Sequence, residues 1–153
     1  PILGRDVYLA LAAVGWSDGV LDPDEADAIV RTALEEGLEL DEIHAIEQAT
    51  QTPVELSVID RLTMTKSDRL YVYAIASWIT RIDGVVSIEE EVALERIGEA
   101  LGIPAAPRAH ADEVVTEIAA LPQGDRPDRF DLARLRATID QRLAAPSVRH
   151  PGQ

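Results

Sequence analysis

A short acidic turn occurs twice in this chain, as SDGVLDPDE at residues 17–25 and as IDGVVSIEE at residues 82–90. Both copies share Asp-Gly-Val, an apolar residue and a closing Glu, and Asp18 and Asp83 are 65 residues apart. Each copy joins two segments with helical periodicity. Because a single helix–loop–helix unit cannot bury its apolar face alone, duplicated units pack as a pair. The repeat therefore predicts a helical fold in which the two acidic turns can form one site.

The remaining segments also have helical character. Apolar residues recur at three- and four-residue spacing, and no segment combines strand alternation with hairpin residues. The pattern predicts an all-α fold, a compact bundle of about seven or eight helices that contains the duplicated helix–loop–helix unit. Leu34 and Val92 are expected to face the core. We expect helices at about 6–17, 23–36, 40–49, 53–62, 66–82, 88–101, 110–121 and 129–144.

Short turns between these helices favour a single domain over residues 1–145. Its repeat units cover about 6–38 and 68–103, and C-terminal helices follow at 110–144. Residues 146–153 are expected to form a disordered tail.

Several helix ends carry capping residues. Asp22 and Ser87 are suited to cap the helix that follows each acidic turn, and a Glu stands three residues after each of them, as in a capping box. Gly19 and Gly84 are expected to stop the preceding helices in the left-handed conformation. Thr52 is expected to begin a further capping box for the helix at 53–62.

The charge limits the classes of partner. The formal net charge is −14, from 28 acidic and 14 basic residues. Such a chain repels phosphate backbones, which disfavours nucleic acid and favours cations or a basic protein partner. Residues 126–149, however, contain six arginines and three aspartates. We expect this basic C-terminal helix to pack against the acidic remainder of the chain.

The absence of cysteine excludes disulfides, thiolate metal sites and a cysteine nucleophile. No apolar stretch approaches about 18 residues, so no membrane span is expected, although peripheral membrane association through a partner is compatible with the sequence. The first residues lack a signal-peptide pattern. We therefore expect a cytoplasmic location.

No motif for nucleophilic, nucleotide-dependent or metalloprotease chemistry is present, so we predict no enzymatic activity and no catalytic residue. His44, His110 and His150 are not expected to form a ligand set together. Trp16 and Trp78 hold similar places near the two turns and are expected in the core or in a subunit contact.

The turns correspond to half of an EF-hand calcium loop. With Gly19 or Gly84 at position 6, the acidic residue at position 5, the apolar residue at 8 and the Glu at 12 are all present. Positions 1 and 3 lack oxygen ligands in both copies, which excludes a self-contained EF-hand site. Two half-cages facing each other can still supply enough oxygens for one cation.

Most of the repeat is explained by helix capping, but Asp18 and Asp83 are not. Each follows a helix C-terminus, where the helix dipole disfavours negative charge by about 0.3–1 kcal/mol. The same unfavourable choice in both copies indicates function, with a solvated acidic face as the alternative. The candidate metal ligands are Asp18, Glu25, Asp83 and Glu90, with Asp22, Asp24 and Glu89 nearby.

The duplicated Asp-Gly-Val turn followed by a Glu-led helix resembles the TerB-like, tellurite-resistance family, and is similar to the N-terminal domain of membrane-anchored DnaJ-like co-chaperones. The resemblance covers about residues 8–103. It implies a helical bundle with two related halves and a divalent cation held by Asp18, Glu25, Asp83 and Glu90. The residues before Asp18, Gly15-Trp16-Ser17, depart from the small residues more usual in that family.

Two functional hypotheses follow. The first is a scaffold in a stress or tellurite-resistance type system that binds Ca²⁺ or another divalent cation, because oxygen-only ligands favour hard cations. The second is a metal-free interaction module that docks a basic partner on its acidic face. An enzyme with paired carboxylates would need two of them in a buried cleft.

Overall fold

The computed structural model describes residues 4–17, 19–81, 86–128 and 130–144. Within these ranges the chain forms seven α-helices and two 3₁₀ turns and has no strand, which confirms the predicted all-α bundle. The 3₁₀ turns are Leu56–Val58 and Arg61–Thr63. The helices are α1 (Arg5–Trp16), α2 (Pro23–Glu35), α3 (Leu40–Gln51), α4 (Lys66–Arg81), α5 (Ile88–Ala100), α6 (Ala105–Ala119) and α7 (Leu132–Ala144).

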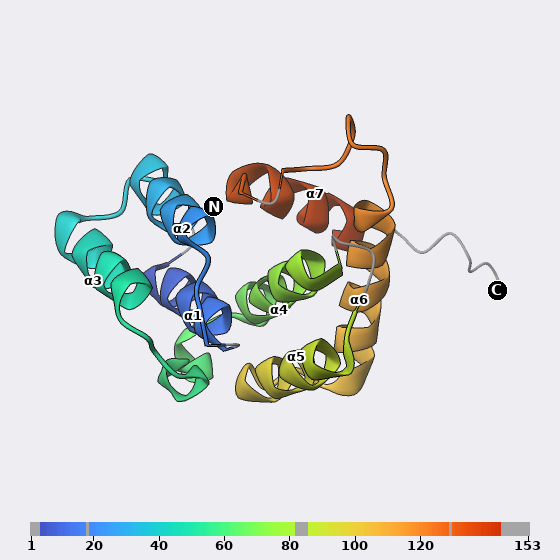
Figure 1. Ribbon diagram of the computed structural model, residues 1–153, viewed down its shortest axis with the longest axis horizontal. Coiled ribbons are helices and arrows are strands. Elements are labelled where there is room, and N and C mark those ends of the chain that lie inside the picture. The colour runs from blue at the N-terminus through green and yellow to red at the C-terminus, as the bar shows by residue number, and fades with distance from the viewer. Residues whose placement is uncertain (1–3, 18, 82–85, 129, 145–153) are drawn as a thin grey trace.

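Helix α4 is the centre of the bundle. It packs against α1, α5, α6 and α7, and α5 and α7 lie on opposite sides of it (Figure 1). Every residue from Tyr71 to Trp78 is buried. A helix that is surrounded on all sides needs apolar residues around its whole circumference. The eight-residue buried run in α4 meets that requirement, and it includes the expected core residue Trp78.

The N-terminal helices form a layer beside α4. Helix α1 packs against α2, α3 and α4, and buries three alanines, Ala10, Ala12 and Ala13. Their small side chains let neighbouring helices approach closely. At the end of α1, the indole Nε1 of Trp16 donates to the carbonyl of Ala49, 2.8 Å away in α3. Trp16 thus joins the two helices rather than lying fully in the core.

The basic C-terminal helix α7 packs across α2, α4 and α6, as expected from its charge. Its buried face consists of Leu132, Leu135 and Ile139. Its Arg136 guanidinium lies 5.5 Å from the centre of the Tyr71 ring in α4, within the range of a cation–π contact. The helix therefore closes the bundle with both apolar and cationic contacts.

The predicted helix at 53–62 is wrong, because this segment forms the two 3₁₀ turns with extended residues between them. Thr52 is extended and ends α3 instead of beginning a capping box. The carboxylate of Asp60 accepts a hydrogen bond from the Leu62 amide at 3.1 Å. Such local bonds compete with helix formation. Leu56 and Ile59 still pack against the core from this irregular segment.

Two helix starts also differ from the sequence prediction. Helix α6 begins at Ala105 rather than at residue 110, with Pro107 in its first turn. Proline is tolerated there because amides of the first turn have no intrahelical acceptor. Helix α7 begins three residues later than predicted, after Asp131, whose carboxylate accepts from the Arg134 amide at 3.0 Å and caps the helix.

Gly19 has the predicted left-handed conformation, and left-handed glycines also follow α2 and α5. Gly19 has φ +100°, and Gly37 and Gly102 have φ +83° and +68°. Gly84 lies outside the described residues. Within the described ranges, none of the helices has the combination of length and apolar character that crossing a bilayer requires.

Candidate functional site

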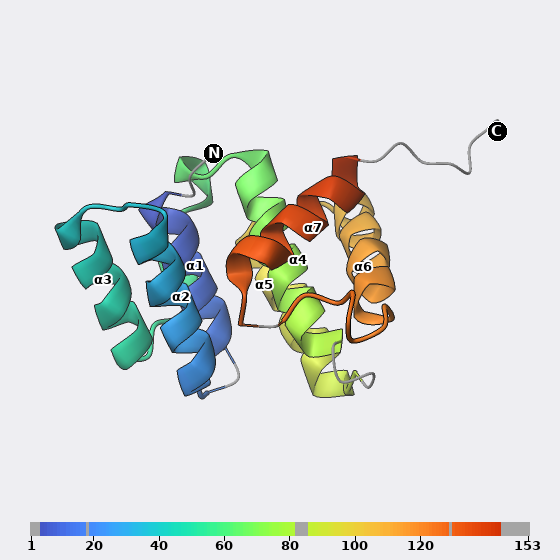
Figure 2. The same ribbon diagram turned by 90° about the horizontal axis from the view of Figure 1, so that it is seen from above.

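The ends of the helices that flank the two acidic turns lie at the same end of the molecule. Figure 2 shows the C-terminus of α1 and the N-terminus of α2 at the lower edge, together with the C-terminus of α4 and the N-terminus of α5. Asp18 and Asp83 themselves lie outside the described residues. The predicted meeting of their carboxylates therefore stays a prediction.

In the second turn the predicted capping residues do cap. The hydroxyl of Ser87 accepts from the Glu90 amide at 3.1 Å, and the Glu90 carboxylate accepts from the Ser87 amide at 2.9 Å. One carboxylate oxygen of Glu90 is therefore already bound to the backbone of its own helix start.

In the first turn Asp22 caps α2 by accepting from the Asp24 amide at 2.8 Å. Glu25 is half-buried, and one of its carboxylate oxygens lies 3.9 Å from the point that a Cβ on Gly15 would occupy. The same glutamate lines a small cavity with Ile75 and Ile79 of α4. The side chain of Glu25 thus lies against α1 in mainly apolar surroundings.

Of the four predicted metal ligands, the structure describes Glu25 and Glu90. They lie in the first turns of α2 and α5, which start at the same end of the molecule (Figure 2). Among the described residues, no group of three or more acidic or histidine side chains is placed to hold a metal ion. Because Asp18 and Asp83 are not among those residues, the four-carboxylate site stays a prediction. His44 and His110 are exposed on α3 and α6.

The distribution of ion pairs separates the helices into two groups. Within the described ranges four arginines of α2, α4 and α7 are in intramolecular pairs: Arg31–Asp27, Arg81–Asp112, Arg136–Asp140 and Arg142–Glu117. Among the described residues, Arg69 of α4 and Arg134 of α7 are in none. In that same part of the chain, no acidic residue of α3 or α5 is in an ion pair. Helix α5 carries five glutamates and one arginine. Glu91 and Glu95 of α5 line a surface cavity with Arg81 and Arg108, although they form no ion pair with them.

Helix α5 also exposes apolar side chains beside those acids. Ile88 is 77% exposed and Val92 is 50% exposed, one turn apart on the outward side of the helix. The expectation that Val92 faces the core is wrong, and so is the same expectation for Leu34, which is 53% exposed on α2. In α5, Leu94 and Ile97 supply the buried face instead.

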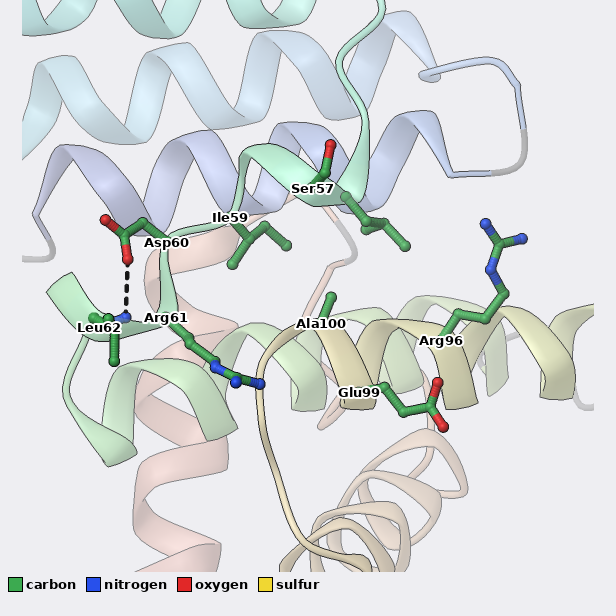
Figure 3. Close-up of a pocket in the computed structure, with 9 residues that line it drawn as sticks. Ser57, Ile59, Asp60, Arg61, Leu62, Arg96, Glu99 and Ala100 are labelled. Carbon is green, nitrogen blue, oxygen red and sulfur yellow. Dashed lines mark hydrogen bonds between the residues drawn. The ribbon is translucent and has the colours of Figure 1, made fainter.

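A groove of about 580 Å³ lies between the last turns of α5 and the segment with the 3₁₀ turns (Figure 3). Ile59 and Ala100 face each other across it, while Arg96 and Glu99 stand on α5. With Asp60 on the other wall, the groove holds charges of both signs.

A second polar cluster lies where α4 meets α6. Asp112 of α6 accepts from the hydroxyls of Tyr73 and Ser77 of α4, and Arg81 stands 3.6 Å from the same carboxylate. Burial, together with the Asp112 carboxylate, raises the pKa of Tyr73. The hydroxyl of Ser77, which is fully buried, accepts a hydrogen bond from the Arg81 guanidinium at 2.9 Å. The cluster joins the two helices.

Sequence reasoning missed this cluster. Asp112 is 39 positions from Tyr73 and 35 from Ser77, and each residue occupies an ordinary place on its own helix. The available signal was Ser77 within the buried run of α4, because a buried hydroxyl requires a hydrogen-bond partner.

Comparison with known proteins gave no match: no family model, no curated protein and no solved structure is similar to the chain. The resemblance to the TerB-like family therefore rests on the duplicated turn alone and stays a prediction.

Proposed function

We propose that this chain is a non-enzymatic interaction module that docks a basic protein partner through the acidic residues of α3 and α5. The observation that carries the proposal is the division of charges. Four arginines of α2, α4 and α7 (Arg31, Arg81, Arg136 and Arg142) are paired within the chain, whereas the acids of α3 and α5 have no ion pair among the described residues.

The physical argument concerns where the unbalanced charge resides. A net charge of −14 on a chain of this size disfavours compaction by self-repulsion, and internal ion pairs reduce that cost. They do not reduce it at α3 and α5, where a cationic partner can. Exposed charges contribute mainly to the rate and selectivity of association, and salt screens them over about 10 Å at 0.1 M.

The test is the binding of an 18-residue lysine–leucine peptide, measured by fluorescence anisotropy, with a glutamate–leucine peptide of the same apolar pattern as control. We expect the basic peptide alone to bind, and its affinity to fall steeply as salt is raised. Neutralising Glu47, Glu91, Glu95 and Glu99 to Gln is expected to weaken binding, and chelator is expected to have no effect. Equal binding of both peptides, or none, would refute the proposal.

A second candidate is a divalent cation held between the two acidic turns, as the resemblance to the TerB-like family implies. It is favoured by the position of the four flanking helix ends at one end of the molecule (Figure 2). Ca²⁺ suits an all-oxygen ligand set. Through the same resemblance, a stress or tellurite-resistance type system is the proposed setting for either function.

A further inference from the structure

Helix α5 presents a narrow apolar stripe, formed by Ile88 and Val92, on an otherwise acidic face. Resting on the proposed function, we infer that this stripe is the docking site for a basic amphipathic helix of a partner protein. The partner helix would place apolar residues on Ile88 and Val92 and lysine or arginine residues beside them.

Helix geometry fixes which acids flank the stripe. At 3.6 residues per turn, Glu91 and Glu95 lie to one side of the line through Ile88 and Val92, and Glu89 lies to the other. None of these three glutamates is in an ion pair within the part of the chain that the structure describes. Arg108 lies on the Glu95 side, where its guanidinium donates to the Glu95 backbone carbonyl at 3.4 Å. A helix lying along the stripe would therefore meet carboxylates on both sides, with Arg108 beyond those on one side.

Charge also sets the limit of the site. Arg96 lies one turn beyond Val92, at the mixed-charge groove shown in Figure 3. Its positively charged guanidinium would repel a further basic side chain of the partner. The cationic part of the partner is accordingly expected over the first two turns of α5, and not over the groove.

The chain already holds a helix of this chemical type. Helix α7 buries Leu135 and Ile139 against the bundle, while its Arg142 stands 3.5 Å from Glu117 of α6. Apolar anchors flanked by arginines thus pack on an acidic helix within this molecule. The α5 stripe offers the same combination, apolar side chains beside carboxylates, with no element of the described chain covering it.

The other exposed apolar residues provide a matched comparison. Leu34 on α2 is 53% exposed and Leu40 on α3 is 83% exposed. Both helices are acidic, so the pair resembles Ile88 and Val92 in number, exposure and net surrounding charge. Leu34 and Leu40 lie on two different helices, however, and form no single stripe.

The experiment compares two peptides on three proteins by fluorescence anisotropy. One peptide is the amphipathic lysine–leucine helix, and the other has the same composition in a scrambled order without an apolar stripe. We expect the double substitution Ile88→Gln/Val92→Gln to raise the Kd of the amphipathic peptide by about tenfold or more. Leu34→Gln/Leu40→Gln is expected to leave it unchanged, and the scrambled peptide is expected to bind all three proteins equally weakly.

A second measurement does not depend on the folding of the double variant. The chain has no cysteine, so Val92→Cys and Leu40→Cys each give one attachment point for an environment-sensitive dye. Addition of the amphipathic peptide is expected to shift the emission of the dye at position 92 to shorter wavelength, and to leave the dye at position 40 unchanged.

The outcomes separate the two proposals. If no basic peptide binds, the proposed function itself fails. If basic peptides bind but the two double variants behave alike, or both dyes respond alike, docking is set by net charge and the α5 site is wrong. If the unmodified protein sediments as a dimer that Ile88→Gln/Val92→Gln dissociates, the stripe is covered by a second copy, which overturns the basic partner.

Discussion

The hydroxyl of Tyr73 stands 3.0 Å from each carboxylate oxygen of Asp112 and donates to that group across the interface between α4 and α6. The Ser77 hydroxyl donates to the same carboxylate at 2.7 Å. Hydrogen bonds to a charged acceptor contribute more than neutral ones, about 1.5–3 kcal/mol each. Asp112 therefore holds together the central helix and the helix that packs on it most extensively.

Replacement of Asp112 by Asn is expected to destabilise the fold. The change removes the negative charge that faces Arg81 and weakens the bonds from Tyr73 and Ser77, with an expected loss of about 1–3 kcal/mol in the free energy of unfolding. Urea denaturation followed by circular dichroism measures it. Glu113→Gln, on the neighbouring exposed position, is the control and should change stability by less than about 0.5 kcal/mol. Equal midpoints for the two variants would contradict a structural role for Asp112.

The three tyrosines of the chain predict a loss of stability at alkaline pH. Burial is the largest cause that raises the pKa of Tyr8, Tyr71 and Tyr73, and nearby carboxylates add to it. A raised pKa in the folded state stabilises the fold fully below the ordinary value of about 10, and this stabilisation is lost as the pH rises above it. Each tyrosine can contribute a slope of about 1.4 kcal/mol per pH unit.

Ultraviolet absorbance of the phenolate tests this prediction. Phenolate is expected to be nearly absent until the protein unfolds, and then to appear together with the loss of helical circular dichroism. Tyr73→Phe should give a shallower dependence of stability on pH. Gradual ionisation near pH 10 with the helical signal intact would show that the tyrosines are accessible to hydroxide.

Periodicity predicted most of the helices because each buries one regular face, and the caps at Asp22 and Ser87 followed from local chemistry. The prediction from periodicity failed at 53–62, where the Asp60 carboxylate accepts from the Leu62 amide and the chain turns between α3 and α4. Local pattern also placed Val92 inward, but the choice between neighbouring apolar residues is made by the helix that α5 packs on. The Asp112 cluster depends on how α4 and α6 meet, which no local pattern specifies.

At the acidic turns, too, local sequence pattern does not specify what each side chain contacts. The sequence treats Glu25 and Glu90 as equivalent, yet Glu90 binds its own N-cap and Glu25 lies against Gly15 of α1. The cavity beside Glu25 is lined by residues of four helices, including Leu132 of α7. Leu132 lies outside both repeat units, so its place beside Glu25 could not be inferred from the repeat.

The left-handed glycine that follows α2 predicts a backbone effect free of side-chain clashes. Gly37 has φ +83°, and a Cβ there would have no heavy atom within 4 Å. Gly37→Ala is therefore expected to cost about 1–2 kcal/mol from the backbone conformation alone. Gly124 is equally open but lacks a positive φ, so Gly124→Ala should lie within about 0.5 kcal/mol of the parent. Similar unfolding midpoints for the two variants would contradict the conformational explanation.

The cation hypothesis predicts a rise in melting temperature with Ca²⁺. A ligand that binds only the folded state stabilises it by about 2.7 kcal/mol at a hundredfold excess over its Kd. Asp18→Asn/Asp83→Asn should abolish the shift, whereas Glu47→Gln/Glu113→Gln, which removes the same charge from exposed positions on α3 and α6, should retain it. Calorimetry with Ca²⁺ and Mg²⁺ gives the stoichiometry, which is expected to be one cation per chain. A shift of the same size in both variants would mean that Ca²⁺ acts by general screening of the acidic surface, and no response in the unmodified protein would end the hypothesis.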